Sequence, residues 1–158
     1  MKRFLATLAF ALSAVAPAHA DTLADQVKAE AQRLLVQVST AESAAKARPG
    51  AKAPGVAPAL VTDLQRFSLA ASRLSIEIDQ GGGPTDLRCI FRGMAEETGK
   101  QLDAVVKATT GGDQAKAYAR LMHMLKDAVE IAPAVGGNAT AASSARAATA
   151  TCPASKDF

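Results

Sequence analysis

Apolar residues recur every three or four positions in four stretches of the chain, residues 23–45, 60–78, 87–105 and 118–129. This spacing places them on one side of an α-helix. The expected core positions are Leu23, Val27, Ala31, Leu34, Val38, Ala41 and Ala45; Leu60, Leu64, Phe67, Ala71, Leu74 and Ile78; Leu87, Phe91, Met94, Thr98, Leu102 and Val105; and Tyr118, Leu121 or Met122, Leu125 and Val129. The pattern predicts four amphipathic helices.

Breaks rich in glycine and proline separate these stretches. They are "ARPGAKAPGVAP", "QGGGPTD" and "TTGGD", and Pro133 follows the fourth stretch. Asp113 is the expected N-cap of the fourth helix. Short breaks between helices of similar length favour antiparallel neighbours. The sequence therefore predicts an all-α, up-down-up-down four-helix bundle over residues 21–132.

The first twenty residues have the pattern of a secretory signal peptide. Lys2 and Arg3 precede an apolar run, and Ala18-His19-Ala20 is a small-x-small cleavage site. The run is shorter than the roughly 20 apolar residues that span a bilayer, and no later stretch reaches that length. We expect cleavage after Ala20, a mature chain that begins at Asp21, and a periplasmic or secreted location.

Cleavage would leave a nearly neutral chain. Lys2 and Arg3 are two of the 18 basic residues, so 16 basic residues would remain against 15 acidic ones. The aromatic residues of the mature chain are Phe67, Phe91, Tyr118 and Phe158. Neither a basic patch nor an aromatic stacking platform is evident, so nucleic-acid binding is not expected.

Residues 133–158 form a tail of low complexity, rich in alanine, serine, threonine and glycine. The tail has little to bury and predicts at most a weak helical turn. It contains Cys152, one of only two cysteines in the chain. Any order in this segment would depend on what that cysteine contacts.

The other cysteine, Cys89, lies about 200° around the third helix from Leu87 and so points away from the core. In an oxidising compartment two cysteines favour one bond, which predicts a Cys89–Cys152 disulfide that ties the tail to the bundle. Gly93, one turn after Cys89, would leave room for the approaching tail. Two free thiols or an intermolecular bond are the alternatives.

The expected architecture is similar to that of the exported cytochromes of the b562 and c′ types, which implies heme or metal binding as an alternative function. However, the C-x-x-C-H attachment motif is absent, and the mature chain has a single histidine, His123. His123 is expected on the polar side of its helix. Met122 and Met124 lie about 200° apart, whereas Met94 and Met122 are expected to face the core as filling residues. We therefore expect no cofactor and no metal.

No catalytic arrangement stands out in the sequence. A nucleophile would need a base nearby, and His123 is the only histidine after residue 20. Gly81-Gly82-Gly83 lacks the Lys-Ser/Thr of a phosphate-binding loop. By elimination, the sequence predicts a non-catalytic binding or accessory protein of a bacterial-type cell envelope, whose protein or small-molecule partner it does not name.

Two apolar residues, Leu69 and Ile76, fall on the outer side of the second helix. We expect the tail to cover them as it crosses the outer faces of the second and third helices. The alternatives are isolated exposed side chains, which are common, or a face for a partner or for weak self-association.

Overall fold

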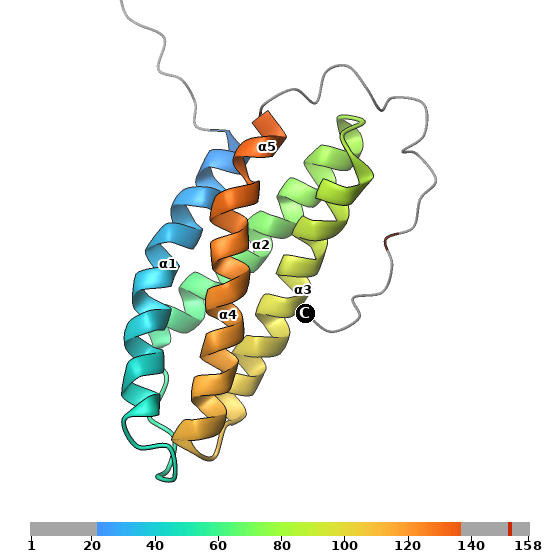
Figure 1. The fold of residues 1–158 in the computed structure, drawn as a ribbon. Helices are drawn as coiled ribbons and strands as arrows, with labels where there is room; N and C mark the ends of the chain where they lie inside the picture. The colour runs from blue at the N-terminus through green and yellow to red at the C-terminus, as the bar shows by residue number, and fades with distance from the viewer. Residues whose placement is uncertain (1–21, 137–151, 153–158) are drawn as a thin grey trace, which may run out of the picture.

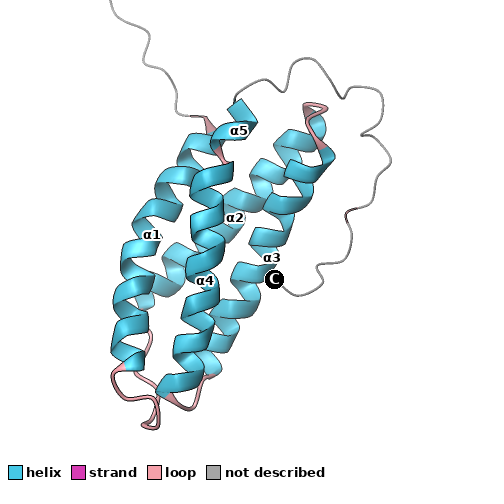
Figure 2. Cartoon of the chain, in the orientation of Figure 1, coloured by secondary structure: helices cyan, strands magenta, loops and turns pink. Residues whose placement is uncertain are grey.

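The computed structural model describes residues 22–136 and Cys152. Its helices are α1 (Leu23–Lys46), α2 (Pro58–Gln80), α3 (Thr85–Lys107), α4 (Gly111–Ile131) and the short α5 (Pro133–Gly136). Figure 1 shows the four long helices side by side along one direction, and Figure 2 shows that short loops join them. The prediction of an up-down-up-down four-helix bundle is confirmed.

The helices pack as a closed square. The most extensive contacts join α1 to α4 and α2 to α3, while α3 with α4 and α1 with α2 complete the ring. The short α5 contacts α1 and α4, so the first residues of the predicted tail close one end of the bundle. Because α4 runs antiparallel to α3, its C-terminal end lies near the start of α3 (Figure 1).

The predicted core positions are largely correct. All six expected positions of α2 are buried, and Phe67 and Phe91 are the largest side chains that are fully buried. Some expected positions are only partly buried and flank the core: Leu23, Ala41, Leu87, Met122 and Val129. Of the two alternatives predicted for one core position of α4, Leu121 is buried and Met122 is only partly buried. The apolar period thus identified the inner side of every long helix.

The predicted N-cap of α4 is wrong. Thr110, not Asp113, occupies that position with extended backbone angles, and its side chain accepts a hydrogen bond from the Asp113 amide at 3.2 Å. The Thr110 hydroxyl also donates to the Asp113 carboxylate at 2.7 Å. Asp113 therefore lies inside the first turn, where its negative charge faces the positive end of the helix dipole.

Cys89 and Cys152 form the predicted disulfide, with their Cα atoms 5.3 Å apart. Both cysteines are partly buried. Cys89 lies in the second turn of α3. The predicted signal peptide and the path of the tail between Gly136 and Cys152 lie outside the described residues.

Candidate ligand groove between α3 and α4

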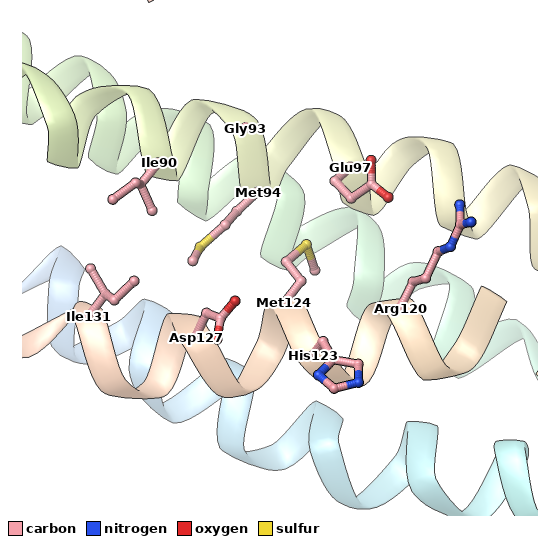
Figure 3. A pocket seen from close by; sticks show the side chains of 9 residues that line it. All are labelled: Ile90, Gly93, Met94, Glu97, Arg120, His123, Met124, Asp127 and Ile131. Carbon is pink, nitrogen blue, oxygen red and sulfur yellow. The ribbon is translucent and has the colours of Figure 1, made fainter. Parts of the chain in front are cut away.

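A groove of about 350 Å³ lies between α3 and α4. Figure 3 shows its nine lining residues, and these come from the two helices alone. They are Ile90, Gly93, Met94 and Glu97 of α3, and Arg120, His123, Met124, Asp127 and Ile131 of α4. A volume of this size lies within the range of small-molecule sites.

The lining residues differ in size along the groove. Gly93 has no side chain, so α3 presents bare backbone there. Ile90 and Ile131 close one end of the groove from opposite helices (Figure 3). Cys89, which forms the disulfide with Cys152, directly precedes Ile90 at that end of the groove.

Two methionines form the apolar floor. Met94 and Met124 are both buried, with 6% and 8% of their surface exposed. The Thr98 side-chain oxygen lies 2.7 Å from the Met94 carbonyl and 3.4 Å from the Met124 sulfur. Since Thr98 is fully buried, this contact orients the Met124 side chain within the helix interface.

A carboxylate follows each of these methionines by three residues. On α3 the pair is Met94 and Glu97, and on α4 it is Met124 and Asp127. Because the helices are antiparallel, Asp127 lies opposite Met94, and Glu97 lies on the Met124 side of the groove (Figure 3). The groove therefore has one acidic side chain on each wall.

The two carboxylates differ in their surroundings. Glu97 is mostly buried, with 14% of its side chain exposed, and it accepts a hydrogen bond from Gln101 Nε2 at 2.7 Å. Lys100 Nζ lies 3.9 Å from its second oxygen. Asp127, by contrast, is exposed, and its side chain makes no hydrogen bond or ion pair with another residue in the described part of the chain. The Asp127 carboxylate is therefore available to pair with a bound group.

His123 is exposed, as predicted. It borders the groove, but its ring points away from the Met94 and Met124 sulfur atoms (Figure 3). Within residues 22–136 and Cys152, no group of three or more His, Cys, Asp or Glu side chains is arranged to hold a metal ion.

The expectation for the inward methionines was wrong for one residue. Met94 is buried, but on α4 the buried methionine is Met124, and Met122 is only partly buried. Helix α4 packs against both α1 and α3, so the buried part of its surface extends from one neighbour to the other. Met124 lies on the part of this surface that faces α3. Met94 and Met124 consequently meet at one interface.

Leu69 and Ile76 do not contribute to the groove. They lie on α2 and are 52% and 53% exposed. The predicted cover would come from the tail, which lies outside the described residues, so this part of the prediction stays a prediction.

A second hollow of about 510 Å³ lies between α1, the start of α4, the connector before α2 and the first turn of α2. Its lining carries no charged side chain: Val36, Gln37, Thr40, Ala41, Ala44, Pro54, Gly55, Ala57, Ala59, Leu60, Gln114 and Tyr118. Burial raises the pKa of Tyr118 above its usual value, so this side chain stays protonated at neutral pH. Because no ionised side chain lines it, this hollow offers fewer charged groups that could orient a ligand than the α3–α4 groove does.

Comparisons with protein families, curated proteins and solved structures found no match to this chain. None of the helices in the described segments combines the length and the apolar character needed to cross a membrane.

Sequence reasoning missed the groove. No role was assigned to Glu97 or Asp127 from the sequence. The signal that could have revealed the groove was the same spacing of a methionine and a carboxylate on two helices predicted to be antiparallel. A glycine, Gly93, directly precedes the methionine on the first of these helices.

Proposed function

We propose that this protein is an exported, non-catalytic binding protein of the cell envelope, and that its ligand site is the α3–α4 groove. The observation that carries the proposal is the groove itself, which combines an apolar floor with a few ionisable groups on its rim. This combination is typical of small-molecule sites, where apolar surface supplies affinity and sparse polar groups orient the ligand.

The envelope location rests on the sequence of residues 1–20, with its basic start, apolar run and small-x-small site. Intact-mass measurement of the exported material tests it. We expect a chain that begins at Asp21, and a mass that retains residues 1–20 would contradict export by this route.

The binding role can be tested with a neutral apolar probe such as Nile red, whose fluorescence rises in an apolar site. We expect Gly93→Leu to weaken probe binding, because it adds a large side chain to a position that lines the groove. Gly99→Leu is the matched control, since Gly99 lies on the same helix and a Cβ there would meet nothing within 4 Å. Circular dichroism should show both variants folded.

A second measurement needs no variant. In the unmodified chain, the methyl carbon resonances of Met94 and Met124 should shift as the probe is added, whereas that of Met122 should not, because Met122 does not line the groove. Probe binding that leaves Met94 and Met124 unperturbed would place the site elsewhere and contradict the proposal.

A further inference from the structure

We propose that the ligand of the α3–α4 groove is an organic cation, a hydrocarbon body that carries one protonated amine or quaternary ammonium group. This inference rests on the proposed function and adds the chemical class of the ligand. It follows from the placement of charge around the apolar floor.

The carboxylates of Glu97 and Asp127 approach the groove from opposite helices and flank the two methionines (Figure 3). A cationic group beside Asp127 would neutralise the unpaired charge on the α4 wall, while Glu97, which already has Lys100 Nζ at 3.9 Å, adds a second carboxylate on the α3 wall. Asp127 makes no ion pair with any other described residue, so pairing with a ligand would not require an existing bond to break. The attraction between a carboxylate and a cationic group is stronger at the edge of an apolar site than in open water, because the surrounding medium screens it less.

The apolar residues continue past Asp127 toward Ile90 and Ile131. A ligand with its cationic group at Asp127 can therefore lay its hydrocarbon body over Met94 and against the two isoleucines. Methionine adapts its shape to different apolar surfaces, and its sulfur is polarisable. The floor thus suits hydrocarbon bodies of varied shape.

Arg120 also lines the groove, at the end away from Ile90 and Ile131. Its guanidinium repels a cation, which favours the Asp127 end for the ligand's charged group. An anion that paired with Arg120 would direct its hydrocarbon body past Glu97, whose carboxylate is mostly buried. The same placement that admits a cation therefore disfavours an anionic amphiphile.

Three probes with the same hydrocarbon chain test the charge preference: octyltrimethylammonium, octyl sulfate and the neutral 1-octanol. The two ionic probes are kept below their critical micelle concentrations and 1-octanol below its solubility limit. The methionine methyl resonances of the full mature chain report binding, with Met122 as the internal reference. We expect the cation to shift Met94 and Met124 saturably and to bind at least about tenfold more tightly than either other probe. Added salt should weaken the binding of the cation alone.

The double substitution Glu97→Gln with Asp127→Asn keeps the shape of the groove and removes both charges. We expect it to lower the affinity for octyltrimethylammonium to that for 1-octanol, with little change for 1-octanol itself. The matched control is Glu96→Gln with Glu130→Gln, which removes the same number of charges from the same two helices at exposed positions outside the groove. The control should bind the cation as the unmodified chain does.

The outcomes separate the two proposals. If octyl sulfate or 1-octanol binds the groove as tightly as the cation, or if the control loses affinity as much as the groove variant, the inferred ligand class is wrong while the groove remains a binding site. If none of the three probes perturbs Met94 and Met124, both the ligand class and the proposed function are wrong.

Discussion

Asp63 joins α1 to α2 through a cluster of polar side chains at the edge of the core. Arg33 and Gln37 of α1 both donate to its Oδ2 atom, and Arg66 of α2 donates to Oδ1 at 3.2 Å. The hydrogen bond from Arg33, followed by that from Gln37, holds the pKa of Asp63 below its usual value. The folded state therefore prefers this carboxylate ionised.

This shift predicts a pH-dependent contribution to stability. Because the pKa is lower in the folded chain, the unfolded chain binds more protons, and stability rises with pH through this range. The contribution of Asp63 is present above its unfolded pKa of about 3.9 and is lost as the pH falls through the lower folded value. We expect Asp63→Asn to lower the melting temperature at neutral pH by an amount that shrinks as the pH falls from about 6 toward about 3.

The control for this prediction is Asp103→Asn. Asp103 pairs with Lys107 along one exposed helix face, where 70% and 75% of the two side chains are exposed, so its removal should have a smaller effect on stability. Melting curves of Asp63→Asn and the unmodified chain that stay equally far apart at every pH would contradict the role given to Asp63.

At the scale of whole elements, the start of α4 shows how closely two helices meet. Gly111 opens α4 directly against the end of α1, and a Cβ built there would lie 2.5 Å from the Arg48 carbonyl oxygen and 2.6 Å from that of Ala45. The Gly111 amide donates to the Ala51 carbonyl at 3.0 Å, which ties α4 to the connector after α1. Only a residue without a side chain fits this contact unless the backbone moves.

We expect Gly111→Ala to destabilise the fold by about 1–3 kcal/mol, the usual cost of overpacking. The matched substitution Gly99→Ala should instead stabilise it by up to about 1 kcal/mol, since alanine favours a helix interior and Gly99 faces open space. Urea denaturation of both variants measures the difference. Equal effects would show that the contact between α1 and α4 tolerates a side chain.

The period of apolar residues predicted the helices well because burial follows a single face. In α2, Leu60 through Ile78 meet their neighbours along one stripe, and all six positions are buried. Helix α4 was harder, because its buried face is broader and includes Met124 in addition to Leu121 and Leu125. A pattern that places core residues on one narrow stripe of a helix does not predict buried residues beside that stripe, such as Met124.

The candidate site was not predictable from periodicity, because it depends on the register of two helices. Met94 and Glu97 acquire a role only when α3 lies antiparallel to α4 with Met124 and Asp127 opposite them. The sequence gives the spacing of methionine and carboxylate within each helix. It does not give the position of one helix along the axis of the other, and that position decides which side chains face each other. The cap of α4 was missed for a related reason, since both Thr110 and Asp113 are suitable capping residues and only the backbone angles distinguish them.

At the scale of the whole molecule, the disulfide joins two positions separated by 63 residues. Cys89 lies near the start of α3, and the chain between the cysteines includes the rest of α3 and all of α4 and α5. The bond therefore restricts the unfolded state of almost half the bundle.

Closing a loop of this length stabilises a fold by roughly 4 kcal/mol in the chain-entropy model, a large share of the roughly 5–15 kcal/mol of a typical domain. We expect reductant to lower the urea midpoint of the unmodified protein while the helical signal persists without urea. Cys89→Ser and Cys152→Ser should be destabilised equally, and the double variant no further, because either change removes the whole bond.

Reductant should leave the double variant unchanged, which controls for effects of the reagent itself. If the reduced and unreduced proteins unfolded at the same urea concentration, the unfolded chain would already be restricted without the bond, and the stability of the bundle would have to come from helix packing alone.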